Sequence, residues 1–537
     1  MTAIQSGNNS DTQTKMNGLF RIIAAIERGG NKLPHPFWLF WILAGVLGVS
    51  SLALSLFGVS VTLPDSDEVV VQNLLSLDGI AFAAESALKN FAEFPPLAVI
   101  VVVFLGVSIA EKSGFLTALL RITVVRLPAR WVTFAIVYSA MISHVMSDSA
   151  FLVMLPLGAL AFRAAGRSPV LGVMVAYTAT AVATSASPLV TPSDALRTSL
   201  ISAAAQLVDA NYVVTPVALY YFSATSSLFL AVVITLVVEL LLAKRPDFAT
   251  VSAEHGDSAI SSASDAGSAV TVADGQGKGQ SMSIHLMPVE RRALKLAGVT
   301  FVFYVVLVVV MLLVPGSPLI GEGGSIVESV VVKNIAVFIS LLFALVGFVY
   351  GRTVGTVPSL SDVPEIMSEG ISRIAPVIVL FFAVSQFLAY FNWTGIGKVL
   401  IVGGADLIRS LNAHPLVILL AIVLAICVLN MFISSGSATL SILAPVLVPM
   451  MMYVNMSPEA AMVAFQIGDS VTNPVTPMLP YFVLALGYIQ QYWKHAGIGT
   501  LMSFTVPIAF VVLIAWSVYF AIWYSLGIPL GPGVDIR

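Results

Sequence analysis

Charged residues are scarce in this chain. Lys, Arg, Asp and Glu together make up 10% of its 537 residues, and the net charge is −3. Soluble proteins carry about 25% charged residues, whereas 58% of this chain is hydrophobic. So few charges cannot keep a soluble particle of this size in water, which argues against a soluble enzyme, a disordered protein and a nucleic-acid-binding protein. We infer that much of the surface faces lipid.

Cysteine is almost absent as well. Cys427 is the only one, which excludes a disulfide framework and a cysteine metal site. Residues 1–35 are polar, with no apolar core before Pro36, so we expect a cytoplasmic N-terminal tail and no cleavable signal peptide.

Long apolar runs, by contrast, are frequent. A helix that crosses a bilayer needs about 20 apolar residues. Two of the runs are too long for one straight helix and contain several prolines, so they predict broken helices; these are 169–208 and 458–491. The other expected spans are 36–59, 96–112, 216–243, 297–315, 329–350, 375–394 and 497–526.

Two further apolar stretches have small polar residues at their centres. Residues 130–165 contain Ser147-Asp148-Ser149-Ala150, and residues 415–453 contain Ser434-Ser435-Gly436-Ser437-Ala438. The two halves of each stretch are too short to cross a membrane, which favours a re-entrant helical hairpin with its tip at membrane depth. The predicted fold is an all-α polytopic membrane protein with about nine transmembrane helices, two of them broken, and two re-entrant hairpins.

Charge placement predicts the orientation. Basic residues mark the cytoplasmic side of a membrane protein; they dominate the N-terminal tail, whereas the loop 60–95 is acidic. The N-terminus is therefore expected inside. By the same count 244–295 is a cytoplasmic linker, and 527–537 is an external C-terminal tail. The part 244–286 is rich in Ser, Ala, Gly and Asp, so we expect it to be disordered.

The linker separates two transmembrane halves, 36–243 and 296–526. Each half has a hairpin followed by a proline-broken helix, and the charge count places the two hairpins on opposite faces. Paired hairpins and broken helices in inverted halves indicate a secondary transporter.

Few ionisable residues lie deep in the spans, and they fall at the predicted breaks and at a hairpin tip: Asp148, Asp194, Arg197 and Asp469. Each costs about 2.5–3.5 kcal/mol at a helix centre, so their retention indicates function. The alternative is a structural ion pair, because Asp194 and Arg197 are three residues apart on one helix face.

The second break offers ligands for a cation. Asp469, Asn473 and Asn430 provide carboxylate and amide oxygens, and prolines free backbone carbonyls nearby. Such hard ligands suit Na⁺ or H₃O⁺. The helix N-termini at the hairpin tips, near Ala150 and Ala438, suit an anionic substrate.

These motifs resemble the p-aminobenzoyl-glutamate transporter (AbgT) family. The resemblance covers nearly the whole chain outside the linker and the extreme N-terminus, and its most specific block runs from Gly468 to Pro477, followed by Tyr481-Phe482. It implies a bowl-shaped homodimer in the bacterial inner membrane with nine transmembrane helices and two hairpins per protomer. It also implies ion-coupled transport of p-aminobenzoyl-glutamate and, for some members, export of sulfonamides that mimic p-aminobenzoate. We expect no cofactor apart from the coupling ion, Na⁺ or H⁺.

The resemblance also assigns roles by position. It places substrate contacts at Asp194, Ser437, Pro458 and Pro477, and the cation site at Asn430, Asp469 and Asn473. Two positions depart from the family pattern, because Leu440 stands where members often have tryptophan and Gln466 where they often have arginine. We include both positions as substrate candidates, with Arg197 as a replacement anion anchor and Ser149 at the first hairpin tip. Ser147 and Asp148 are further tip residues.

Three other functions compete with this interpretation. A Na⁺-coupled dicarboxylate transporter would use a similar site of hairpin tips. A membrane enzyme would need a nucleophile with a base or a metal motif, and the spans contain neither His-Glu-x-x-His nor Gly-x-Ser-x-Gly. A channel would need a continuous polar pore, which hairpins that meet at mid-membrane disfavour.

Overall fold

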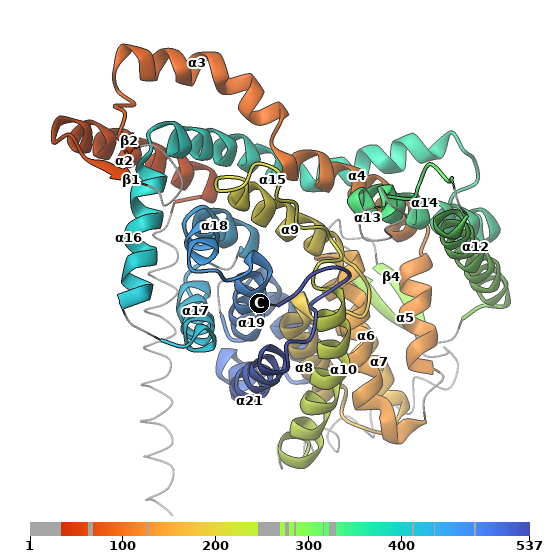
Figure 1. Cartoon of the computed structure of the whole chain (residues 1–537). Helices are drawn as coiled ribbons and strands as arrows, with labels where there is room; N and C mark the ends of the chain where they lie inside the picture. Colours follow the sequence, from red (N-terminus) through yellow and green to blue (C-terminus); the bar gives the residue numbers. More distant parts are fainter. Residues whose placement is uncertain are drawn as a thin grey trace, which may run out of the picture.

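The computed structural model confirms a mostly helical membrane protein (Figure 1). It describes residues 34–62, 68–125, 128–244, 269–273, 279–283, 286–314, 316–321, 329–410, 413–433, 435–476 and 479–536. Most of the predicted N-terminal tail and of the linker lie outside these residues.

The described residues contain eight helices that are long and apolar enough to cross a membrane, or nine if the bent pair α16 (Ile396–Ser410) and α17 (Pro415–Asn430) is one span. All but one correspond to expected spans; the exception, α18 (Gly436–Tyr453), is an arm of the second predicted hairpin. The spans outside the hairpins are α2 (Pro36–Leu56), α4 (Pro95–Lys112), α10 (Tyr220–Val237, continued by the π-helical turn Val238–Leu242), α12 (Pro288–Leu313), α14 (Ile335–Val354), α15 (Asp362–Trp393) and α21 (Ile498–Leu526).

Both predicted hairpins are present. The first consists of α6 (Val132–Ser143), a 3-10 turn (His144–Met146) and α7 (Ser149–Ala164), after the 3-10 turn Ala129–Trp131. The second consists of α17 (Pro415–Asn430) and α18 (Gly436–Tyr453). The first tip turns through Ser147, whose φ of 48° is rare for a residue with a side chain.

Both broken helices are present as well. The first is α8 (Pro169–Val182), a 3-10 turn (Ala183–Ser185) and α9 (Pro192–Ala205); the second is α19 (Pro458–Thr472) and α20 (Pro480–Tyr492). Pro192 and Pro480 each open the helix after the break. The first helical position suits proline because its N–H would have no partner there and its φ is already helical.

Several elements lie where the sequence predicted loops. Residues 60–95 contain the paired strands β1 (Ser60–Thr62) and β2 (Glu68–Val70) and the helix α3 (Leu77–Ala92), which projects from the molecule in Figure 1. Inside the predicted linker, the described residues include β3 (Ala269–Ala273) and β4 (Gly279–Ser283), which pair antiparallel. The remaining short helices are α5 (Phe115–Val125), α13 (Val330–Lys333) and α16 (Ile396–Ser410).

Two helices begin earlier than expected. α12 starts at Pro288, inside the predicted linker, and α15 starts at Asp362 rather than near residue 375. The charged first turns of α15 are held against the end of α4 by ion pairs, of which Lys112–Glu369 is 2.7 Å long. Charges that looked like the boundary of a span are thus part of a longer helix.

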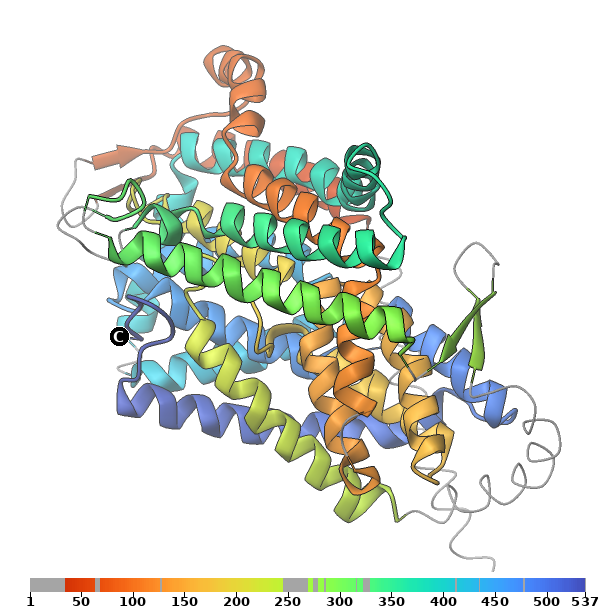
Figure 2. The ribbon, with the colours of Figure 1, turned by 90° about the vertical axis from the view of Figure 1, so that its right-hand side faces the viewer.

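The helices form two layers. One layer contains α2, α4, α12, α14 and α15, and the other contains the hairpins and broken helices with α10 and α21 (Figures 1 and 2). The layers meet mainly where α4 packs against α9. Within the hairpin layer, α7 and α8 touch through Gly158 and Gly172. A Cβ on Gly158 would lie 2.5 Å from the carbonyl oxygen of Gly172, and a Cβ on Gly172 would lie 2.2 Å from that of Gly158. Only glycines permit this approach.

Different contacts hold the two ends of the molecule. At one end, ion pairs join helix ends: Glu111–Arg373, Lys112–Glu369, Arg121–Glu290 and Arg167–Glu239. At the other end the C-terminal segment packs on the starts of α10 and α19, where Leu530 O accepts from Phe222 N and Ile536 O accepts from Ser457 Oγ. Residues 527–536 are therefore a packed segment rather than a loose tail.

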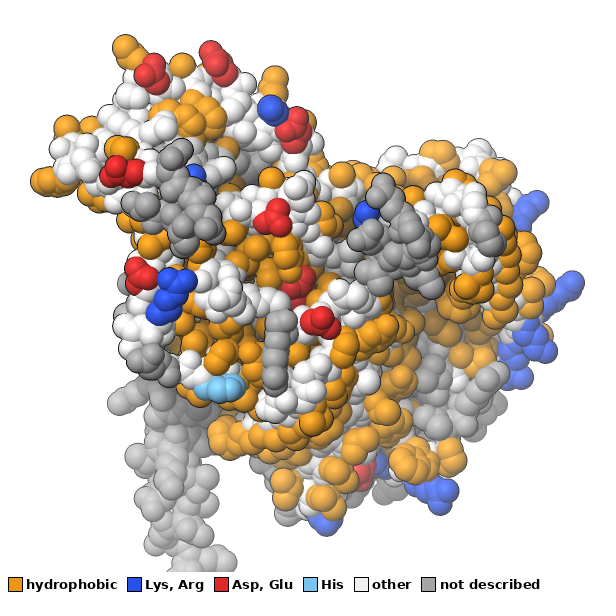
Figure 3. All heavy atoms as spheres, viewed as in Figure 1, with side chains coloured by type: hydrophobic (Ala, Val, Ile, Leu, Met, Phe, Trp, Pro, Cys, Tyr) orange, Lys and Arg blue, Asp and Glu red, His pale blue; other side chains and the backbone are white. Residues whose placement is uncertain are grey.

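Apolar side chains cover much of the outer surface (Figure 3). The window of α12 that passes as a membrane span is only 11% buried, and Val302 and Phe303 are 59% and 67% exposed. Such a surface is suited to lipid, as the composition predicts.

Candidate functional site

Both hairpin tips and both helix breaks meet at one cavity of about 460 Å³. The first tip contributes Ser147 to Ser149, and the second contributes Ser435 to Ser437. Helix α9 contributes Arg197, and α19 with its break contributes Asp469 and Asn473. The structure thus brings together seven of the expected site residues: Ser147, Asp148, Ser149, Arg197, Ser437, Asp469 and Asn473.

A buried ion pair links the two halves at this cavity. Arg197 Nη2 lies 3.4 Å from Asp469 Oδ2, and the two side chains are only 7% and 3% exposed. Arg197 Nη1 also donates to Thr184 O at 3.1 Å. The cation of the first broken helix therefore compensates the carboxylate of the second one in the low-polarity interior.

Asp194 does not form the alternative pair with Arg197. Its Oδ2 accepts from both N and Oγ1 of Thr191 at 2.8 Å, and its own N–H donates to Thr191 Oγ1. This is a capping box that fixes the start of α9 after the break. Asp194 faces a separate small hollow beside Thr198 and Tyr220 instead of the main cavity.

An amide cluster lies directly behind the ion pair. Asn430 Nδ2 lies 2.8 Å from Asp469 O, 2.8 Å from Thr472 Oγ1 and 2.9 Å from Asn473 Oδ1. Asn473 Nδ2 in turn donates to Thr184 Oγ1 at 2.9 Å. The cluster joins α17, α19 and the first break, so it brings the three expected cation-site residues together.

The chemistry of this cluster bears on cation binding. Asn473 Oδ1 and the carbonyl of Asp469 are hard ligands, and Asn430 Oδ1 is buried without a hydrogen-bond partner. The carboxylate of Asp469, however, already faces Arg197. A cation at this position would have to compete with the guanidinium, and the described residues contain no group of three or more His, Cys, Asp or Glu that could hold a metal ion.

The second tip approaches the carboxylate closely. A Cβ on Gly436 would lie 2.9 Å from both carboxylate oxygens of Asp469, so only glycine fits without a shift. Helix α18 begins at this glycine, and its N-cap Ser435 accepts from Ala438 N. The positive end of α18 therefore points toward Asp469, an anion that the protein itself supplies.

Several expected substrate residues lie away from the cavity. Leu440 and Gln466 are each 1% exposed and do not line it, and both amide atoms of Gln466 are buried without a partner. Pro458 starts α19, about 16 Å along the helix axis from Asp469. Pro477 lies outside the described residues.

Other residues at the cavity were not identified from the sequence. Phe151 stacks on Tyr481 with ring centroids 4.2 Å apart and planes 5° apart, and both line the cavity. Glu111 and Arg373 also line it and form a 2.8 Å ion pair. Opposite charges near the ends of two predicted spans were the only available signal for this pair.

The comparisons with known proteins agree over nearly the whole chain. The sequence model of the AbgT putative transporter family matches residues 21–537. The p-aminobenzoyl-glutamate transport protein of Escherichia coli K12 is 33% identical over 515 residues, which cover 95% of this chain and 96% of that protein.

Two solved structures are similar to this one. The YdaH transporter of Alcanivorax borkumensis, described as having an unusual topology, has a TM-score of 0.82 and 32% identity, with 93% of this chain and 100% of that chain covered. MtrF of Neisseria gonorrhoeae, described as illuminating a class of antimetabolite efflux pumps, has a TM-score of 0.84 and 33% identity, with 96% and 100% covered. These relatives are transporters rather than enzymes.

Proposed function

Because this chain belongs to the AbgT transporter family, as its motifs predicted, we propose that it is an ion-coupled secondary transporter of p-aminobenzoyl-glutamate or a related small aromatic anion. Sulfonamides that mimic p-aminobenzoate are included in this proposal. The observation that carries it is the single cavity at which both hairpin tips and both helix breaks meet around Arg197.

The contents of the cavity suit an aromatic anion. Arg197 provides a guanidinium that can bind a carboxylate through two N–H groups. The stacked rings of Phe151 and Tyr481 provide an apolar aromatic wall, beside which an aminobenzoyl ring can pack. Leu440 and Gln466 lie away from this wall, so their departure from the family pattern leaves the cavity's own contacts intact.

The same ion pair supports the proposal of ion coupling. A proton or Na⁺ at Asp469 would weaken its attraction to Arg197 and leave the guanidinium available to the substrate carboxylate. Asn430 and Asn473 would supply neighbouring oxygens for Na⁺. We thus propose that the coupling ion competes with Arg197 for the carboxylate of Asp469.

We also propose a homodimer in the bacterial inner membrane with the N-terminus in the cytoplasm. The ion-paired end, which carries Arg121, Arg167 and Arg373, would then face the cytoplasm, as the preference of basic residues for that side predicts. The C-terminal segment would lie at the opposite face.

A flux assay in proteoliposomes tests this function. Purified protein is given p-aminobenzoyl-glutamate, p-aminobenzoate, a sulfonamide or the dicarboxylate succinate, each with an imposed Na⁺ or H⁺ gradient. We expect saturable movement of the aromatic anions that stops when one of the two gradients is collapsed.

The alternatives give different results in the same assay. Flux of succinate without flux of the aromatic compounds would replace this proposal with a dicarboxylate transporter. Flux that does not saturate and does not respond to either gradient would contradict a coupled carrier, and unitary currents in a planar bilayer would identify a channel.

A further inference from the structure

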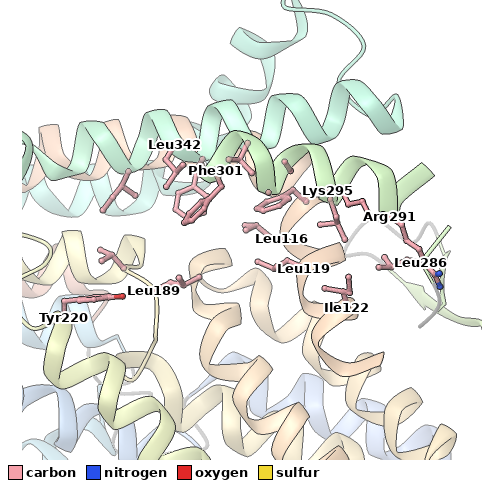
Figure 4. Close-up of a pocket in the computed structure, with 18 of the residues that line it drawn as sticks. Leu116, Leu119, Ile122, Leu189, Tyr220, Leu286, Arg291, Lys295, Phe301 and Leu342 are labelled. Carbon is pink, nitrogen blue, oxygen red and sulfur yellow. The ribbon is translucent and has the colours of Figure 1, made fainter. Parts of the chain in front are cut away.

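A second and larger cavity lies outside the transport site, between the two layers. It measures about 1030 Å³ and opens between α5, α12 and α14 (Figure 4). Its walls are almost entirely apolar, with Leu116, Phe301 and Leu342 on the three helices. We call it the α5–α12 crevice. No step of the proposed transport uses it.

One end of the crevice is basic. Arg291 and Lys295 are the charged residues that line it, and both belong to the first turns of α12. They are four residues apart, so they share a helix face. Both are exposed, and within the described residues neither has an ion pair. The nearest acidic residue on the helix, Glu290, is engaged by Arg121 at 2.9 Å.

The depth of the crevice matches one leaflet of a bilayer. Its lining on α12 runs from Arg291 to Phe301, which is about 15 Å along a helix. The hydrocarbon core of a bilayer is about 30 Å thick. A lipid whose headgroup lies at Arg291 would therefore end its acyl chains near Phe301.

We propose that the α5–α12 crevice binds an anionic phospholipid, with its acyl chains on the apolar walls and its phosphate between Arg291 and Lys295. Charge complementarity selects an anionic headgroup. The polar glutamyl part of an aromatic substrate would find few partners on these walls, so the crevice suits acyl chains better than that substrate.

Gly298 provides a way to fill the crevice. It lines the cavity on α12, and a Cβ built on it meets no atom within 4 Å. The backbone therefore has open space for a side chain at this position, and we expect the ring of a phenylalanine to occupy the space proposed for the acyl chains. Gly45 in α2 offers a matched control, because its Cβ would also meet no atom within 4 Å and it does not line the crevice.

The experiment is a lipid titration of the delipidated full-length protein by native mass spectrometry. The probes are phosphatidylglycerol and phosphatidylcholine with identical acyl chains. The wild-type protein should bind phosphatidylglycerol about 30-fold more tightly, since each basic residue contributes a few-fold attraction. The double variant Arg291→Gln/Lys295→Gln should lose this preference, and Gly298→Phe should weaken the binding of both lipids at least tenfold.

The controls are Gly45→Phe and the double variant Arg130→Gln/Lys244→Gln, which removes an exposed arginine and an exposed lysine away from the crevice. Both should bind lipid as the wild type does. A thermal melt in lipid-free detergent verifies that Gly298→Phe is folded.

Three results would overturn the proposal. The first is equal binding of the two lipids by the wild type, or a loss of lipid binding that is as large in the control variants as in Arg291→Gln/Lys295→Gln and Gly298→Phe. The second is displacement of phosphatidylglycerol by p-aminobenzoyl-glutamate, which would make the crevice a substrate site. The third is a change of oligomeric mass in Gly298→Phe, which would make it an interface between copies. The lipid assay needs no transport, so a failure of the proposed function would not affect it.

Discussion

The two halves of the chain repeat the order hairpin and then broken helix, but they bring opposite charges to the cavity. The first half supplies Arg197, whereas the second supplies Asp469 and the amides Asn430 and Asn473. The carboxylate of the first broken helix, Asp194, is used for capping. A repeated order of elements therefore does not imply repeated chemistry, and the site is complete only where the halves meet.

The two hairpin tips differ in the same way. The first tip turns through Ser147 at a positive φ, and Asp148 at the N-cap of α7 makes no side-chain capping bond. The second tip has the side-chain cap of Ser435 and places Gly436 against the Asp469 carboxylate. The first tip is strained and open to the cavity, and the second is closely fitted to a charge.

The largest effect is expected from breaking the ion pair between the halves. Arg197→Gln leaves Asp469 buried without its cation, so the free energy of unfolding should fall by about 3–5 kcal/mol and substrate flux should be lost. The measurements are denaturant unfolding in detergent and the proteoliposome assay.

A double-mutant cycle separates the pair from its surroundings. Arg197→Gln/Asp469→Asn should cost clearly less than the sum of the two single variants, because it leaves no unpaired charge. Additive losses would mean that the two halves are not coupled through this contact.

The next effect concerns the fit of the second tip. Gly436→Ala places a methyl group 2.9 Å from the Asp469 oxygens, so the tip must shift, with an expected loss of about 1–3 kcal/mol and a marked loss of flux. The control is Gly487→Ala in α20, where a Cβ meets no atom within 4 Å. An unchanged transport rate in Gly436→Ala would show that the tip tolerates movement.

A similar loss of stability is expected from a change in the amide cluster that lies behind the Arg197–Asp469 ion pair. Asn430→Ala removes the amide that contacts three acceptors, at a cost of about 1–3 kcal/mol, and should raise the ion concentration needed for half-maximal flux. Asn334→Ala, which removes an exposed amide, is the control. If the ion dependence stays as in the wild type, Asn430 only holds the helices together.

The smallest effects should have opposite signs at the two tips. Ser147→Gly relieves a positive φ and should stabilise the protein by about 1 kcal/mol, whereas Ser435→Ala removes a helix cap and should destabilise it by about 1 kcal/mol. Thermal unfolding of both variants in one detergent compares them directly. If the unfolding temperatures of both variants shift in the same direction, the first tip is not strained relative to the second.

The order of elements could be predicted because its signals are local. Apolar length, prolines and small polar clusters indicate spans, breaks and tips within each segment, and the structure has all of them. The sequence predicts too late a start for α15, because the residues of α4 that form ion pairs with its first turns lie far away in the sequence. Strands β1 and β2 are only three residues each, too short for a clear alternation of apolar and polar residues.

The site could be predicted only in part. Chemistry and resemblance together named seven of the residues that line the cavity, and Arg197 and Asp469 among them came from the cost of charge in a membrane. That Arg197 and Asp469 form an ion pair could not be predicted from the sequence, because 272 positions separate them. Leu440 and Gln466 were named by position in a family pattern. They lie three residues along their helices from Ser437 and Asp469, and neither lines the cavity.

The glycine contact between α7 and α8 has a mechanical consequence. Since Gly158 and Gly172 interlock backbone against backbone, the two helices cannot slide past each other and should move as one rigid body. A motion that opens the cavity to the other face then needs its hinge elsewhere, most simply in the break between Val182 and Pro192. Spin labels on α7 and α8 should keep one distance in every transport state, while a pair across the break should not.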